Sequence, residues 1–118
     1  MNGISPQLQN QITQYQQAQQ QLQAITTQKV QMEAQKKEME RTVEELNNST
    51  GTVYRNVGSL LVQVDDRDKL KSEIEDSIET MEIRVKGLER QEKSLREKYE
   101  SLRDLINKAM GQQPAGSQ

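Results

Sequence analysis

The sequence contains no cysteine, histidine, tryptophan or phenylalanine among its 118 residues. The absence of cysteine rules out a disulfide framework and is compatible with a reducing cytosol, so we expect a cytoplasmic protein. Without histidine or cysteine, the usual zinc sites and the Ser-His and Cys-His catalytic pairs are excluded. The six glycines form neither GxGxxG nor GxxxxGK[ST], so no phosphate-binding loop can be read. We therefore expect no catalytic residue, no metal and no cofactor, and we predict that the protein is not an enzyme.

Apolar residues are also scarce. Hydrophobic residues make up 31% of the chain and aromatic residues 3%, too little to fill an ordinary globular core. The net charge of −2 gives no general attraction to nucleic acid or to anionic membranes, so neither is expected as a partner. No apolar run approaches the roughly 20 residues that span a bilayer, and no signal peptide is evident at the N-terminus. The length suits a single small domain.

The apolar residues that are present recur in a first heptad, which predicts a helix over residues 6–47. Ser5 and Pro6 suit the N-cap and the first helical position. The stretch from Asn47 to Gly51 ends the pattern, with Gly51 as a candidate C-cap. The a positions are Leu8, Tyr15, Leu22, Lys29, Lys36 and Val43, and the d positions are Gln11, Ala18, Ile25, Met32, Met39 and Leu46.

A second heptad predicts a helix over residues 66–110. Asp65, with Asp68 three residues further on, is a candidate cap for its start. Residues 111–118 are predicted to form a disordered tail. The a positions are Lys71, Ile78, Val85, Glu92, Tyr99 and Ile106, and the d positions are Ile74, Met81, Leu88, Leu95, Leu102 and Ala109.

The two predicted helices have nearly equal length and a short connection, which favours an antiparallel coiled coil. The preferred register places an a residue of one helix in a layer with a d residue of the other. Its layers include Tyr15–Leu102, Ala18–Tyr99, Ile25–Glu92, Lys29–Leu88 and Lys36–Met81. The charged seam residues Lys29, Lys36 and Glu92 weaken a coiled coil but can fix its register; a flexible arm that opens around a bound chain is the alternative. Gly87, at an exposed position, is either a hinge or a tolerated surface residue.

The segment VYRNVGSLLVQV, within residues 52–64, predicts a β-hairpin at the closed end of the coiled coil. Strand-forming residues flank the turn-forming Asn56–Ser59, in which Gly58 is expected to have a positive φ. A lone hairpin is marginally stable and its open edges invite pairing, so we predict that it is an oligomerisation element rather than an intrachain cap. Its two faces are predicted to carry Leu60, Val62 and Val64, and Tyr54 and Leu61. The predicted oligomerisation residues are Val53, Tyr54, Val57, Leu60, Leu61, Val62 and Val64.

Two segments, VYRNVGSLLVQV and the helical ERQEKSLREKYESL, resemble the β-type subunits of the prefoldin family, and the likeness covers nearly the whole chain. The α-type subunits of that family have a second hairpin, which this sequence lacks. The resemblance implies a mainly α fold, a two-helix coiled coil whose hairpin joins an intersubunit β-barrel. It also implies a hexamer of two α-type and four β-type subunits. This hexamer would act as an ATP-independent holdase. Such holdases capture unfolded polypeptides at the coiled-coil tips and deliver them to a group II chaperonin.

The free ends of both predicted helices carry apolar residues outside the seam, which we interpret as part of a client-binding tip. Such residues could instead widen the seam. The predicted client-binding residues are Ile4, Leu8, Ile12, Leu102, Leu105, Ile106 and Met110. The glutamine-rich N-terminal arm has no charged side chain before Lys29, so it could hold non-native chains of either charge; a low-complexity aggregation tract is the alternative. A coiled-coil scaffold or tether, oligomerised through the hairpin, is the other functional class.

Overall fold

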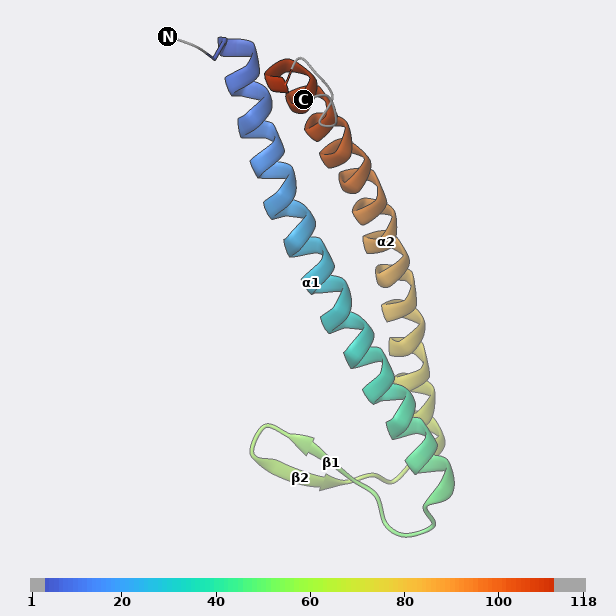
Figure 1. Cartoon of the computed structure of the whole chain (residues 1–118). Coiled ribbons are helices and arrows are strands. Elements are labelled where there is room, and N and C mark those ends of the chain that lie inside the picture. Colours follow the sequence, from blue (N-terminus) through green and yellow to red (C-terminus); the bar gives the residue numbers. More distant parts are fainter. Residues whose placement is uncertain (1–3, 112–118) are drawn as a thin grey trace. The chain divides into compact units, whose positions relative to one another are not determined.

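The computed structural model describes residues 4–111 as two long helices joined by a β-hairpin (Figure 1). The elements are α1 (Pro6–Asn48), β1 (Tyr54–Val57), β2 (Leu60–Gln63) and α2 (Arg67–Gly111). The predicted fold class, mainly helical with one antiparallel hairpin, is confirmed. Gly111, which was assigned to the predicted tail, is still part of α2, and residues 112–118 lie outside the described residues.

The chain forms two compact units, and each helix contributes to both. Among the described residues, the terminal unit comprises residues 4–29 and 87–111, and the hairpin unit comprises Val30–Lys86. Within the terminal unit, Tyr15 of α1 contacts Tyr99 of α2. Within the hairpin unit, Lys36 of α1 contacts Glu82 of α2. The segments of α1 and α2 run antiparallel in each unit, as the equal helix lengths predicted.

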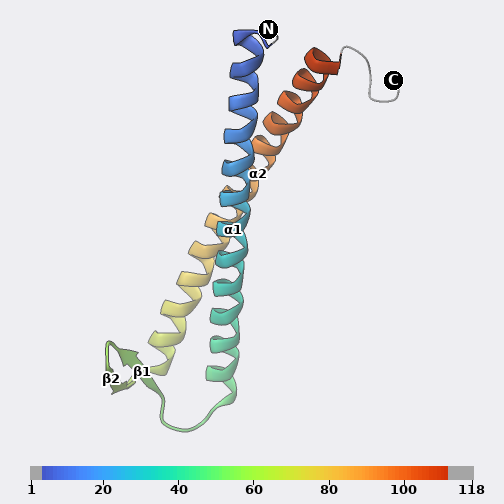
Figure 2. The ribbon, with the colours of Figure 1, turned by 60° about the vertical axis from the view of Figure 1, so that its left-hand side comes forward.

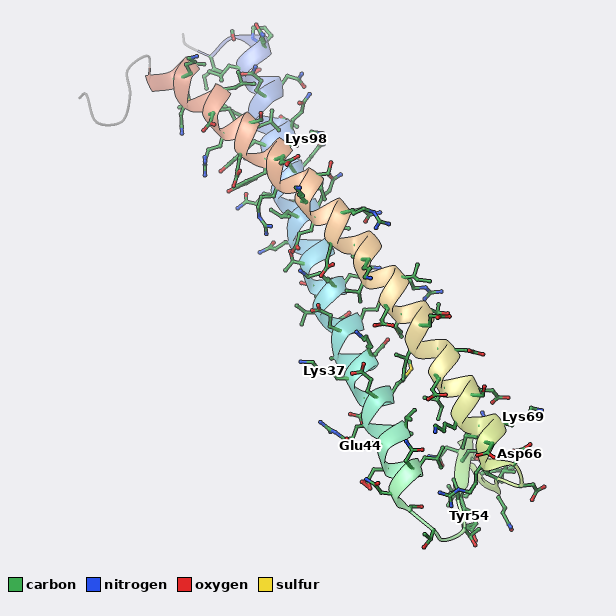
Figure 3. The ribbon with its side chains drawn as sticks, turned by 90° about the vertical axis from the view of Figure 1, so that its right-hand side faces the viewer. Lys37, Glu44, Tyr54, Asp66, Lys69 and Lys98 are labelled. Carbon is green, nitrogen blue, oxygen red and sulfur yellow. The ribbon has the colours of Figure 1, made fainter. Side chains whose placement is uncertain are left out.

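The heptad positions form the packed side of both helices. Within residues 6–111, every predicted a and d side chain is buried or half-buried except Ala109, which is exposed. The buried apolar residues are Leu8, Ala18, Leu46, Val85, Leu88 and Leu102. In contrast, Lys37 and Glu44 follow seam residues by one position, and Figure 3 shows their side chains projecting from α1. In the part of the chain that the structure describes, neither helix has an apolar stretch long enough to cross a membrane.

The two helix starts are capped by side-chain oxygens. At α1, the backbone N–H of Leu8 donates to Ser5 Oγ over 3.0 Å, as the sequence predicts. At α2, the N–H of Lys69 donates to Asp66 Oδ1 over 3.0 Å, so the prediction of Asp65 as the cap is wrong. The reason is local: the N–H of Val64 donates to the carbonyl of Val53 over 2.8 Å, which extends the hairpin pairing. Asp65 is therefore needed as the link between the hairpin and the helix.

The end of α1 does not use a glycine cap. Gly58 is the one glycine with positive φ among the described residues, so the candidate C-cap Gly51 does not have the conformation that such a cap requires. The helix ends at Asn48, three residues earlier. Carbonyl groups at this end instead accept hydrogen bonds from the guanidinium of Arg67, which begins α2.

Candidate functional site

The hairpin is a two-stranded antiparallel sheet with a two-residue turn. Val57 pairs with Leu60, and Gly58 in the turn has φ 61°, the sign that a primed hairpin turn requires at its first central residue. Asn56 and Val57, which were predicted to belong to the turn, lie in β1 instead. A tight two-residue turn matches the twist of the strands, so fewer residues are needed to reverse the chain.

The strand register sorts the hairpin side chains into two faces, because residues directly opposite each other share a face. The predicted separation of Val62 from Leu61 is confirmed by this pairing. The aliphatic face carries Val53, Arg55, Val57, Leu60, Val62 and Val64, and the mixed face carries Tyr54, Asn56, Leu61 and Gln63.

All eight strand residues are exposed, although five of them are large hydrophobic residues. The exposed fraction is 70% for Leu61 and 42% even for Val62. Hydrogen-bonded pairs alternate along an antiparallel ladder, and the bond from Val64 to Val53 fixes which pairs these are. It follows that Tyr54 and Leu61, with Asn56 and Gln63, direct their backbone N–H and C=O groups outward. Within residues 4–111 neither edge has a partner strand, and none of these four side chains is charged.

The base of the hairpin is less exposed than its strands, and the hairpin has an ion pair with α2 of the same unit. Val53 and Val64 are half-buried, and Arg55 Nη1 lies 3.7 Å from Glu73 Oε1 of α2. Figure 2 shows the hairpin next to the first turns of α2, and Figure 3 labels Tyr54 of β1 and Asp66 at the α2 start. The Arg55–Glu73 pair is half exposed on both sides and contributes little stability by itself.

The predicted tip residues all lie in the terminal unit, and the structure divides them by exposure. Ile4, Leu105 and Met110 are 48–61% exposed. Ile12 and Ile106 are half-buried, and the seam residues Leu8 and Leu102 are at most 9% exposed. Three of the seven side chains are therefore available to a bound chain without any opening of the helices.

The same unit holds a tyrosine pair in its seam. The rings of Tyr15 and Tyr99 stack with centroids 4.7 Å apart and an interplanar angle of 17°. The hydroxyl of Tyr15 donates a hydrogen bond to the hydroxyl of Tyr99 over 2.9 Å. Each phenol hydroxyl therefore has a partner inside the seam. This hydrogen bond is the main cause that raises the pKa of Tyr15 above its ordinary value of 10.0, with burial second. The predicted register placed these residues in neighbouring layers and missed the pair.

A charged cluster lies further along that seam. Glu92 is buried, and its carboxylate accepts hydrogen bonds from Lys29 Nζ and from Thr26 Oγ1, both at 2.8 Å. These bonds lower the pKa of Glu92, the one from Lys29 most strongly. Thr26 is one residue away from the predicted layer partner, Ile25. Lys29 and Glu92 were predicted to face apolar residues; the structure joins them to each other instead.

The described residues offer little for a metal ion or a small molecule. Within residues 4–111 no group of three or more acidic side chains is placed to hold a metal. An open groove of about 320 Å³ in the hairpin unit is lined by Val43 and Ile78 with Glu40 and Glu75. It marks a place where the seam packs loosely.

Comparison with known proteins gives a consistent result. The sequence pattern of the family described as "Prefoldin subunit" matches residues 9–113. A prefoldin subunit beta of Methanospirillum hungatei is 44% identical over 108 residues, which cover 90% of this chain and 89% of that protein. A prefoldin subunit beta of Thermoplasma volcanium is 41% identical over 93% of this chain and 90% of its own. The crystal structure of the prefoldin beta subunit from Thermococcus strain KS-1 superposes with a TM-score of 0.80 at 37% identity, covering 92% of this chain and 96% of that one.

Proposed function

The chain belongs to the prefoldin family of chaperone subunits, and we propose that it acts as the β-type subunit of an ATP-independent holdase. Four copies would assemble with two α-type subunits through their hairpins, which complete a β-barrel between subunits. The complex would capture unfolded polypeptides in the cytoplasm and deliver them to a group II chaperonin. The observation that carries the assembly step is the hairpin with two open edges and an exposed aliphatic face.

The hairpin chemistry supports pairing on both sides. An exposed strand edge normally carries charges, proline or a bulge that blocks addition of another strand. Here the outward-directed positions are uncharged, and both strands are regular over four paired residues. A subunit that offers two such edges can be bonded to a neighbour on each side, which is what a closed ring of hairpins requires.

Client capture would use the exposed apolar residues of the terminal unit. Ile4, Leu105 and Met110 come from the beginning of the described chain and from the end of α2. Each apolar side chain covered by a client contributes about 1 kcal/mol or more to binding. Methionine also adapts its shape to different partners, which suits clients of varied sequence. Contacts of this kind require no nucleotide, so capture would proceed without ATP.

The test is a triple variant, Ile4→Ser with Leu105→Ser and Met110→Ser, assembled with an α-type subunit. Light scattering of a diluted unfolded protein, with no nucleotide present, measures suppression of aggregation. We expect suppression to fall sharply at unchanged complex mass. The control is Val30→Ser with Ile83→Ser, because these residues are similarly exposed and apolar but lie in the hairpin unit.

Two outcomes would contradict the proposal. Equal loss of suppression in the triple variant and its control would show that exposed apolar surface in general, rather than the tip, holds clients. A wild-type complex of hexameric mass that never suppresses aggregation would favour the alternative, a coiled-coil scaffold oligomerised through its hairpin.

A further inference from the structure

Arg67 connects three parts of the hairpin unit through one side chain. Its Nη1 donates to the carbonyl of Gly51 over 2.9 Å. Its Nη2 donates to the carbonyls of Leu46 and Ser49 over 2.5 Å and 2.6 Å. Leu46 belongs to the last turn of α1, whereas Ser49 and Gly51 belong to the segment that leads from α1 to the hairpin. A residue of α2 thus holds both the end of α1 and the chain that follows it.

The end of α1 needs such a donor. Its last turn, which lies wholly within the described residues, carries no basic side chain, and no glycine cap follows it. Of its unsatisfied carbonyls, that of Glu45 accepts from the N–H of Ser49, and that of Leu46 accepts from Arg67. A guanidinium at this place also complements the negative end of the helix dipole. Arg67 therefore supplies from α2 what the sequence of α1 lacks.

The same contacts restrict the direction of the hairpin. The segments at its base are residues 49–53, which lead in, and residues 64–66, which lead out. Arg67 binds the first segment and directly follows the second. Without these bonds, the base would be held by the Val64–Val53 backbone bond, by contacts of half-buried valines and by the half-exposed Arg55–Glu73 pair.

We propose that Arg67 is a positioning residue for assembly: its guanidinium fixes the hairpin relative to the helices of its unit, so that the strand edges meet neighbouring subunits in a defined direction. This inference rests on the proposed assembly through the hairpin. An element that is already oriented loses less conformational entropy on binding than one that samples many directions. Loss of the clamp should therefore weaken assembly without changing any residue of the interface.

The first measurement uses the isolated subunit. The sequence has no cysteine, so Ser59→Cys and Glu79→Cys carry spin labels specifically, one at the hairpin turn and one on an exposed site of α2 in the same unit. We expect one narrow distance distribution with Arg67 and a clearly broader one in Arg67→Met. Arg67→Lys should be intermediate, because an ammonium keeps the charge but not the fork of donors. An unchanged distribution in Arg67→Met would overturn the proposal.

The second measurement is the affinity of assembly with an α-type subunit, by concentration-dependent mass measurement well below the unfolding temperature. Arg67→Met should weaken assembly at least tenfold at similar helix content. The control is Val43→Ala, which destabilises the same unit by removing a seam contact but leaves the hairpin base intact. If Val43→Ala weakens assembly as much at equal loss of stability, Arg67 acts through stability alone and the proposal is wrong.

The outcome also separates this proposal from the one on which it rests. If a charge on the aliphatic face leaves assembly intact, the hairpin is not the assembly element, whatever the labels report. If that charge abolishes assembly but Arg67→Met leaves its affinity unchanged, the hairpin assembles the complex and the positioning role of Arg67 is refuted.

Discussion

The helical seam and the hairpin differ in where their apolar side chains find partners. In the seam, apolar residues such as Leu88 and Leu102 are buried within the single chain, and the buried Glu92 has hydrogen-bond donors. In the hairpin, Leu60 and Leu61 are mostly exposed and both strand edges are open among the described residues. One chain is therefore sufficient for the helices but leaves the hairpin incomplete, which is why we propose the hairpin as the assembly element.

The largest expected effect comes from a charge in the hairpin. Val62→Asp places a carboxylate on the aliphatic face, opposite Arg55, which is already paired with Glu73. Assembly would bury this added charge at a cost of several kcal/mol. Sedimentation should show small species in place of the complex, while circular dichroism still shows the helices. Ser59→Asp is the control, because it adds the same charge in the turn. If Val62→Asp still sediments as an intact hexamer, the hairpin is not the element through which the subunits assemble.

A smaller effect is expected when the seam loses a polar partner. Lys29→Met leaves the buried Glu92 without its main hydrogen-bond donor, so the melting temperature of the subunit should fall by several degrees. Replacing both partners, Lys29→Met with Glu92→Leu, should recover most of the loss because no buried charge remains. A double variant no more stable than Lys29→Met alone would mean that the loss does not come from an unpaired buried charge.

The pH dependence of the same cluster gives a finer test. Hydrogen bonds from Lys29 and Thr26 hold the pKa of Glu92 below its ordinary value of 4.5. The ionised carboxylate therefore contributes stability in full above that value, and this contribution is lost as the pH falls through the lowered pKa. Thermal melts of the wild type and of Glu92→Gln should differ most near neutral pH and converge in acid. Parallel curves over the whole range would contradict this assignment.

The smallest effect concerns Gly87 of α2, which was predicted to lie at an exposed position but is half-buried. A Cβ at this position would meet one atom within 4 Å, Arg90 Nη2 at 3.8 Å, so alanine fits without a clash. Gly87→Ala should stabilise the subunit by about 0.5–1 kcal/mol through helix propensity alone, measured by chemical denaturation. If the more stable variant also loses client capture at unchanged complex mass, Gly87 acts as a hinge. If client capture is unchanged, Gly87 is a residue that the helix merely tolerates.

The sequence predicted those features that repeat. The heptad identified the buried side of both helices apart from Ala109, and the alternation of strand residues sorted Val62 and Leu61 to opposite hairpin faces. The Lys29–Glu92 pair was not predicted, although the predicted register places these two opposite charges in adjacent layers. That signal was available in the sequence.

Features that depend on a single long-range contact could not be predicted in this way. Arg67 binds backbone carbonyls, which every residue has, so no pattern of side chains marks its acceptors. The cap at Asp66 rather than Asp65 depends on how far the hairpin pairing extends, which is set by the bond between Val64 and Val53. The roles assigned to the tip and hairpin residues stay predictions until the variants above are measured.

The stacked tyrosines give the protein a built-in optical reporter. The chain has three tyrosines and neither tryptophan nor phenylalanine, so its near-ultraviolet signal comes from Tyr15 and Tyr99 in the terminal unit and from Tyr54 in the hairpin. Two aromatic rings 4.7 Å apart are close enough for their electronic transitions to couple, and Tyr15→Phe would alter that coupled signal while leaving the hairpin chromophore intact. The hydrogen bond with Tyr99 raises the pKa of the Tyr15 phenol above its ordinary value of 10.0. Comparison of the wild type with Tyr15→Phe would thus distinguish the signal of the terminal unit from that of the hairpin without an added label.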